Sequence, residues 1–420
     1  MRSCYTILMR IPLATSGLRH TDIEVAISTL RTNQLTMGKK VHEFEKAVAE
    51  YLGVKYFVMV NSGSSANLAI FEALLRPSIG KPILNIGDGV LVPAVAWPTS
   101  IWPIIQLGLS PVFVDVNSDD LAINLDLAQK EVNKNKEIKA IFPIHPLGYA
   151  IDYKLLNDFC EKNSLIQIND VCESLGSWRG SNHAGTGGIA STFSFYFSHH
   201  ITTMEGGGIA TNDLNFADDI RAIRSHGWSR DRSDVNSWTQ NNSAGLLTQN
   251  ISKNQSKFQF ITTGYNIRPM EIQAAIGIEQ LKELDNFVLR RRHIAKSVYH
   301  ALENSNFQVI DAGTFGGDET QQHHSWMLIP IRIKKELTES NSRLIDELLE
   351  NFEIESRPVL TGNFLNQPAI KKFKNFPNAS NFPVAQLVSN NYFMVGCHHD
   401  LSDDQVKYLC SKLRIIAESI

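Results

Sequence analysis

Cysteine is scarce in this chain of 420 residues, and no two of its five cysteines form a C-x-x-C pair. The odd count and the wide spacing argue against a disulfide framework. We therefore expect reduced, mostly buried thiols at Cys4, Cys160, Cys172, Cys397 and Cys410.

The sequence also lacks a long apolar run and an excess of charge of one sign. No stretch approaches the roughly 18 apolar residues of a transmembrane helix. Arg10 and Pro12 interrupt the short apolar start, which makes it a poor signal peptide. The formal net charge of −3 gives no footprint for nucleic acid. We therefore predict a cytoplasmic location without a membrane or nucleic-acid partner.

What is present is the composition of a globular protein, with 43% hydrophobic and 20% charged residues. Short apolar runs alternate with helical patterns in the first half of the chain. This order predicts an α/β fold in which helices cover both faces of a mainly parallel sheet. The expected strands are 56–60, 89–97, 111–116, 140–148 and 165–170.

The remaining patterns divide the chain into domains. Helices are expected at 23–30 and 41–52, and the polar residues 229–256 read as a surface loop or insertion. A long helical stretch then leads to a later strand, so we predict a large domain followed by a smaller one, with the N-terminal segment able to pack on the latter. The corresponding ranges are 268–303 for the helical stretch, 326–333 for the strand, 1–285 for the large domain and 286–420 for the small one.

A turn of small residues, NSGSSAN at 61–67, lies between a predicted strand and a predicted helix. Backbone N–H groups at a helix N-terminus form an anion site, Gly63 permits close approach, and Ser64 adds a hydroxyl donor. A plain helix cap explains the same residues. Asp170, at the end of another strand, lies where ligands bind in α/β sheets, although it could equally cap the next helix.

The segment TFSFYFSHHITTMEGGGIATND at 192–213 is more specific. Together with NSGSSAN, VPAVAWPTS, VFVDV, Asp170 and GYNIRPMEIQAAIGIEQL, it resembles the DegT/DnrJ/EryC1/StrS family of pyridoxal-phosphate (PLP) sugar aminotransferases along nearly the whole chain. In that family's motif, three residues separate Ser-Phe from a lysine. In this chain the position is His199, as in the branch of nucleotide-sugar 3-dehydratases that make 3,6-dideoxy sugars.

The resemblance implies a fold type I aminotransferase-like architecture with a small C-terminal α+β domain. It implies that Gly63, Ser64 and Ser194 bind the cofactor phosphate. Trp97 is expected to stack on the cofactor ring, and Asp170 to pair with the ring nitrogen and keep it protonated.

Further roles follow from the same resemblance. Glu173 is expected to assist near Asp170. Asn266 would reach the phosphate of a neighbouring subunit's cofactor, which implies a homodimer with shared sites. Arg357 and Asn363 are weaker candidates for contact with substrate or co-substrate.

A histidine at the lysine position changes the expected reaction. Histidine cannot hold the cofactor covalently but can still move a proton, since its ordinary pKa leaves it largely neutral near pH 7. The resemblance therefore implies non-covalent PLP or pyridoxamine phosphate (PMP), with L-glutamate as amino donor. The expected reaction removes the C3 hydroxyl of a nucleotide-linked 4-keto-6-deoxyhexose, in dideoxysugar and lipopolysaccharide O-antigen biosynthesis.

Some members of this branch also carry a [2Fe–2S] cluster, which needs nearby thiolates. The stretch RSHGWSRDRSDVNSWTQNN after the glycine motif contains no cysteine, so we expect no cluster, and this favours GDP over CDP as the nucleotide. No histidine spacing suggests a metal site. Two alternatives stay open: an aminotransferase whose lysine is displaced to Lys253 or Lys257, and an inactive nucleotide-sugar-binding relative.

Overall fold

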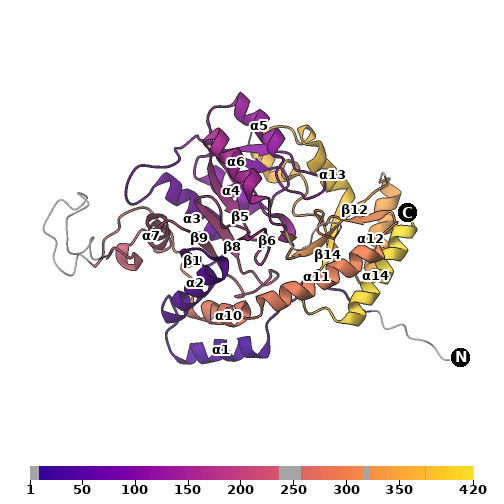
Figure 1. The fold of residues 1–420 in the computed structure, drawn as a ribbon, viewed down its shortest axis with the longest axis horizontal. Helices are drawn as coiled ribbons and strands as arrows, with labels where there is room; N and C mark the ends of the chain where they lie inside the picture. The colour runs from indigo at the N-terminus through magenta and orange to yellow at the C-terminus, as the bar shows by residue number, and fades with distance from the viewer. Residues whose placement is uncertain (1–8, 236–256, 316–321, 336, 374) are drawn as a thin grey trace.

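The computed structural model describes residues 9–235, 257–315, 322–335, 337–373 and 375–420. A seven-stranded sheet forms its centre (Figure 1), in the order β1-β9-β8-β5-β4-β2-β3. The pairings among β2, β3, β4, β5 and β8 are parallel, whereas β9 runs antiparallel to both of its neighbours. The strands are β1 Tyr56–Val60, β2 Gly89–Pro93, β3 Ser110–Val114, β4 Ile138–Ile141, β5 Ile166–Asp170, β8 Ala190–Ser194 and β9 Gly207–Thr211.

This sheet confirms the predicted α/β class with mainly parallel strands. Two strands are shorter than expected, because β2 ends at Pro93 and β4 at Ile141. After β4, Pro143 and Pro146 cannot donate to a strand ladder, and Leu147 takes a left-handed φ of 51°. The chain therefore leaves the sheet there and enters a short 3-10 helix.

Helices cover both faces of the large sheet. Alternate side chains of β1 show the division: Val58 and Val60 share an apolar core with α3 and α7, whereas Phe57 and Met59 share one with α2 and α10. Helices α5 and α6 cover the strands β2 and β4 on the second face. The helices are α1 His20–Arg31, α2 Lys39–Leu52, α3 Gly63–Leu75, α4 Pro98–Gln106, α5 Leu125–Lys134, α6 Tyr153–Asn163, α7 Leu214–Ile223 and α10 Glu271–Leu281.

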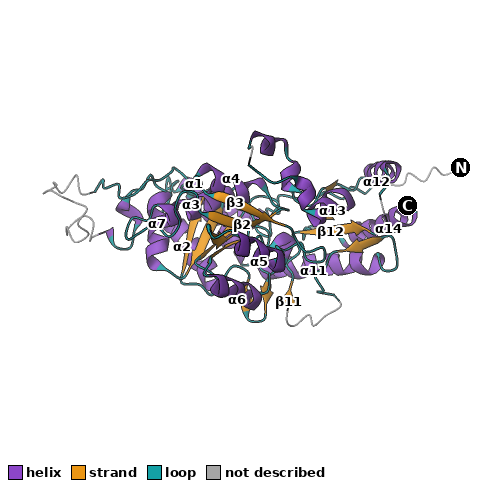
Figure 2. Cartoon of the chain, turned by 90° about the horizontal axis from the view of Figure 1, so that it is seen from above, coloured by secondary structure: helices purple, strands orange, loops and turns teal. Residues whose placement is uncertain are grey.

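A four-stranded antiparallel sheet, in the order β10-β12-β14-β13, lies beside the large one (Figure 2). Ile11 pairs with Ile354 and joins the apolar core under this sheet, so the N-terminal segment lies against the C-terminal part of the chain. The elements are β10 Phe307–Val309, β12 Leu328–Ile333, β13 Ser356–Arg357, β14 Tyr392–Gly396, α11 Leu284–Ala301, α12 Glu339–Asn351, α13 Pro383–Asn391 and α14 Asp403–Glu418. A third, small sheet joins β6 Trp178–Arg179, β7 Asn182–His183 and β11 Gln322–His323.

The expected helical stretch 268–303 is two helices, α10 and α11, separated by a turn at Lys282 and Glu283. Helix α11 connects the two sheets. Its start, through Phe287 and Val288, packs in the core of the large sheet, and Ile294 and Val298 pack in the core of the smaller one. The predicted boundary at 285/286 lies within this helix and stays a prediction.

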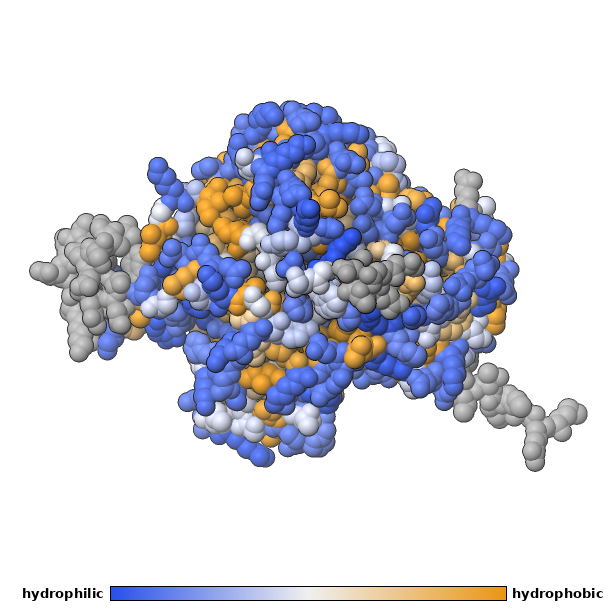
Figure 3. Space-filling model, viewed as in Figure 1, coloured by the Kyte–Doolittle hydropathy of each residue, from blue (hydrophilic) through white to orange (hydrophobic). Residues whose placement is uncertain are grey.

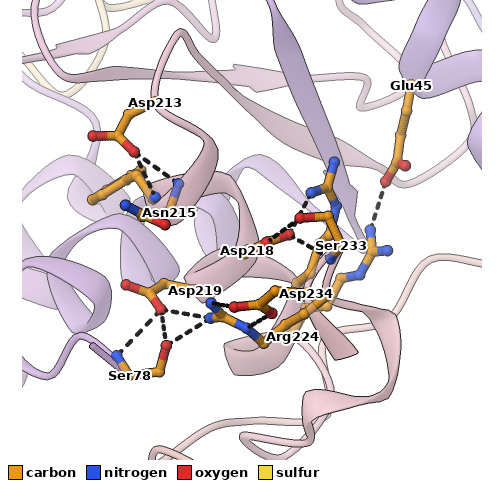
Figure 4. A network of polar contacts seen from close by, with 12 residues as sticks. Glu45, Ser78, Asp213, Asn215, Asp218, Asp219, Arg224, Ser233 and Asp234 are labelled. Carbon is orange, nitrogen blue, oxygen red and sulfur yellow. Dashed lines mark hydrogen bonds and ion pairs between the residues drawn. The ribbon is translucent and has the colours of Figure 1, made fainter. Parts of the chain in front are cut away.

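The described beginning of the polar segment is tied to the fold by ion pairs (Figure 4). Arg232 contacts Asp219 at 3.0 Å and Asp234 at 2.7 Å, and it donates to the hydroxyl of Ser78 at 2.6 Å. Its partners Ser78, Asp219 and Asp234 lie close together in Figure 4. Residues 229–231 form a 3-10 helix. The predicted loop otherwise falls largely on residues 236–256, outside the described residues, as does Lys253.

Candidate active site

A cavity of about 380 Å³ lies where the carboxyl ends of several large-sheet strands face the smaller sheet. Parallel strands bring segments far apart in sequence to this edge. Met327 and Arg357 close the cavity from the side of the smaller sheet. Eight of the ten predicted site residues line it: Gly63, Ser64, Trp97, Asp170, Glu173, Ser194, His199 and Arg357.

The N-terminus of α3 forms one wall. Ser62 caps the helix by accepting a hydrogen bond from the backbone of Ser65 at 3.1 Å. The first intrahelical bond is donated by Ala66, so the N–H groups of Gly63 and Ser64 precede the ladder and can serve an anion.

Close packing explains the glycines around this turn. A Cβ on Gly63 would lie 2.6 Å from the Cβ of Ser194. Gly207 pairs with both Val60 and Ser194, and a Cβ there would lie 2.4 Å from the nitrogen of Gly63. The glycine motif after Glu205 therefore lets β9 pass directly beneath the helix terminus.

Asp170 is the buried carboxylate of the cavity. Its Oδ2 accepts hydrogen bonds from the Asn67 amide at 3.0 Å and the Ser100 hydroxyl at 2.7 Å. Its Oδ1 accepts from the backbone N–H of Cys172 at 3.0 Å. These donors fix the carboxylate and stabilise its charge. Sequence reasoning missed Asn67 and Ser100, although each lies in a motif that it quoted.

Trp97 and Arg357 meet at the opening. The indole of Trp97 is 45% exposed, although large apolar side chains are usually buried, so its ring is available to a flat ligand. The Arg357 guanidinium carbon lies 5.8 Å from the centre of a Trp97 ring. This contact joins the large and small sheets across the cavity.

Glu173 is buried in the cavity wall, and burial raises the pKa of its carboxyl to about 7. Its Oε2 accepts from the backbone N–H of Leu147 at 3.0 Å, and the carbonyl of Leu147 accepts from the backbone of Met327 at 2.9 Å. The group can therefore gain or lose a proton near neutral pH.

His199 is half-buried and faces the same cavity. Its Nδ1 lies 2.5 Å from the carbonyl oxygen of Cys172. A carbonyl can only accept, so Nδ1 carries the proton and Nε2 keeps its lone pair. Burial lowers the pKa of His199 to about 4, against the effect of the Cys172 carbonyl and with help from Arg291 and Arg357. The imidazole is therefore neutral at pH 7.

The structure does not bring Asn363 and Asn266 into this cavity. Asn363 is fully buried: its Nδ2 donates to Ala379 at 2.9 Å, and its Oδ1 caps Leu365 at 3.1 Å. In this structure the side chain stabilises a turn, and its contact with substrate stays a prediction. Asn266 is exposed, and its backbone forms an isolated antiparallel β-bridge with the buried Ser225.

The remaining side chains of interest lie elsewhere. Lys257, one alternative lysine, is exposed and does not line the cavity. Burial lowers the pKa values of His145, His200 and His324, and none of the three lines the cavity. The four described cysteines are free, and Cys4 lies outside the described residues.

Within the described ranges, no group of three or more histidine, cysteine, aspartate or glutamate side chains is arranged to hold a metal ion. Among the same residues, no helix is both long and apolar enough to cross a membrane.

Known proteins resemble this chain over nearly its whole length. A relative from Yersinia pseudotuberculosis, GDP-4-keto-6-deoxy-D-mannose 3-dehydratase, is 35% identical over 97% of this chain and 99% of its own. The Escherichia coli enzyme of that name with bound hydrated PLP superposes with a TM-score of 0.86, at 33% identity over 97% of this chain and 100% of that one. A histidine-to-asparagine variant of GDP-4-keto-6-deoxymannose-3-dehydratase with bound GDP-perosamine superposes with a TM-score of 0.85, at 33% identity over 96% of this chain and 100% of that one.

These likenesses confirm the predicted aminotransferase-like fold. The profile of one family, described as the DegT/DnrJ/EryC1/StrS aminotransferase family, matches residues 17–414. With this match and a relative above 30% identity, the chain belongs to the DegT/DnrJ/EryC1/StrS aminotransferase family.

Proposed function

We propose that this protein is a B6-dependent 3-dehydratase that removes the C3 hydroxyl of a GDP-linked 4-keto-6-deoxyhexose, with L-glutamate as amino donor. One observation carries the proposal: His199, with a neutral ring and a free Nε2, lines the cavity, and the family resemblance implies a lysine at its place in the motif. The relatives named above as 3-dehydratases support it.

The donor set of the cavity fits a pyridoxal or pyridoxamine phosphate. The N–H groups of Gly63 and Ser64 and the hydroxyl of Ser194 suit a phosphate. Asp170 suits a protonated ring nitrogen, and the exposed face of Trp97 suits an aromatic ring. When bound, this cofactor supplies an amine for the sugar ketone and an electron sink for the bond that breaks.

His199 is the proposed proton-moving group. It carries no primary amine, so it cannot tether the cofactor as a lysine would. Because the Cys172 carbonyl oxygen keeps the ring proton on Nδ1, Nε2 is the atom that can accept a proton. Glu173, whose pKa lies near 7, is a second group on the same wall that can hold a proton.

Arg357 is proposed to bind an anionic part of the ligands. It is a cation at the mouth of the cavity, and both a nucleotide diphosphate and the carboxylates of glutamate are anions that guanidinium groups bind well. The cytoplasmic location and the pathway in which the product is used stay predictions.

We further propose a homodimer in which Asn266 completes the partner's site. Asn266 is exposed, and the outer face of α1 carries Ile23, Ile27 and Leu30 at helical spacing, all exposed, with Met270 exposed nearby. Apolar helix faces of this kind are typical of interfaces. On the face seen in Figure 3, apolar residues form separate patches in a mainly hydrophilic surface.

A product assay tests the reaction. The protein is incubated with pyridoxal phosphate, glutamate and GDP-4-keto-6-deoxymannose, and the products are analysed by mass spectrometry and NMR. We expect a 3-deoxy ketone with released ammonia, and less conversion of the CDP-linked sugar. A 4-amino sugar would contradict the proposal and favour amino transfer. Binding without conversion would favour an inactive relative.

The variant His199→Lys is the matched control. A lysine there should bind the cofactor covalently, which borohydride reduction followed by mass spectrometry detects as a mass increase on that peptide. The wild-type protein should show no such adduct.

A further inference from the structure

Arg291 is a buried cation next to the proposed catalytic histidine. It lies in the run of three arginines at 290–292, on the part of α11 between the two apolar cores. Its side chain is 2% exposed. A cation without water needs fixed acceptors, because an uncompensated buried charge is costly.

Four backbone carbonyl oxygens supply those acceptors. Nη1 donates to Met327 at 2.9 Å, to Cys397 at 3.1 Å and to Trp326 at 3.2 Å, all beside strands of the smaller sheet. Nη2 donates to His199 at 3.2 Å. The planar fork of arginine reaches both sides at once, which a lysine ammonium cannot do.

We propose that Arg291 is a positioning residue for the dehydratase, whose guanidinium fastens the main chain of His199 to the smaller sheet and holds the imidazole at its place in the cavity. The inference rests on the proposed function. Arg291 touches the carbonyl of His199 and not its ring, so it acts through His199 and through Met327, which lines the cavity.

The charge has a second effect. A cation near an imidazole disfavours its protonated form, so Arg291 helps to keep His199 neutral. Arg291 also lowers the pKa values of His200, His398 and His399, although burial is the larger cause for each of them. The other ionisable groups facing His199 in the cavity are Asp170, Cys172, Glu173, Tyr196, Glu205 and Arg357, and those facing Arg291 also include Cys397 and Asp400.

Two variants separate geometry from charge. Arg291→Lys keeps the charge but loses the fork, so we expect kcat to fall about tenfold with little change in KM. Arg291→Met loses both, so kcat should fall and the pKa of His199 should rise by about one unit. The matched control is Arg290→Met, the preceding residue on α11, which binds Leu401 and Asp403 instead and should change neither quantity.

The pKa of His199 can be measured by a method that does not depend on enzyme activity. Diethyl pyrocarbonate acylates neutral imidazole, so the pH dependence of acylation at the His199 peptide, followed by mass spectrometry, gives the midpoint. A wild-type protein without dehydratase activity would sink the proposed function, whereas these midpoints would still test the effect of Arg291.

Two results would overturn the inference. One is a wild-type kcat in Arg291→Lys. The other is an unchanged acylation midpoint of His199 in Arg291→Met, together with a loss of activity that only matches the fraction of unfolded protein. Should Arg291→Met not fold, the kcat and KM of Arg291→Lys alone decide.

Discussion

The hydroxyl of Ser100 donates a 2.7 Å hydrogen bond to the carboxylate of Asp170, although the two residues lie 70 positions apart. Removing it in Ser100→Ala leaves Asn67 and the Cys172 N–H on the carboxylate. We expect pyridoxal phosphate to bind about fivefold more weakly, which corresponds to roughly 1 kcal/mol for one such bond. Fluorescence titration measures this. Ser419→Ala, at the exposed end of α14, is the control and should not change affinity.

A methyl group at position 63 tests the packing beneath the phosphate turn. Gly63→Ala places a Cβ 2.6 Å from that of Ser194, so either the helix terminus or β8 must shift. We expect a lower melting temperature and weaker cofactor binding. The double variant with Ser194→Gly removes the clashing atom and should recover much of the lost stability, measured by thermal unfolding. No recovery would mean that Cys172 Sγ, at 3.0 Å, governs the site.

The buried pair of Glu45 and Arg224, joined at 2.6 Å, predicts an acid-sensitive contribution to stability (Figure 4). Burial raises the pKa of Glu45, but the Arg224 guanidinium outweighs it and the pKa falls to about 2. A lowered folded pKa stabilises the fold above the unfolded value of 4.5, and this stability is lost as pH falls toward 2. Denaturant unfolding at pH 7 and pH 3 should show Glu45→Gln less stable at pH 7 by on the order of 3 kcal/mol, with a smaller difference at pH 3.

Glu173 predicts an inflection in the pH dependence of the dehydration rate. Burial brings its pKa to about 7, so its protonation changes in the assay range. Glu173→Gln keeps the shape but cannot ionise, and the inflection near pH 7 should disappear from a plot of kcat/KM against pH. An unchanged inflection would assign it to the substrate or to the cofactor.

Mixed dimers test the sharing of sites through Asn266. His199→Asn and Asn266→Asp are each expected to be nearly inactive, the second because a carboxylate would repel a phosphate. If each site takes His199 from one chain and Asn266 from the other, a mixed dimer contains one intact site. Mixing the two variants after mild dissociation should therefore restore activity. Sites formed within one chain would give no recovery.

Much of this arrangement could be predicted from the chain alone. Strand ends are visible as apolar runs that stop at polar residues, and Asp170 is such a residue, at the end of β5 beside the α3 turn. His199 was identified by its place in a motif, since a histidine pair in a loop carries little signal by itself. Both residues could be found in this way because apolar runs and motifs are read from residues that are neighbours in the sequence.

What could not be predicted depends on contacts between distant segments. The turn at Lys282 and Glu283 contains no proline or glycine that would predict a break between the two helices. Asn363 looked polar and available, but Ala379 and Leu365 occupy its side chain. Arg291 was one of three consecutive arginines, and only the folded chain shows which of them turns inward.

Helix α11 has a mechanical consequence. It is continuous from residue 284 to residue 301 and anchored in both apolar cores, so it acts as a rigid strut between the two sheets. A wide hinge motion that separates the two sheets would pull one end of this helix out of the apolar core in which it is packed. We therefore expect ligands to enter at the mouth of the cavity, where Trp97 and Arg357 meet, without separation of the two sheets.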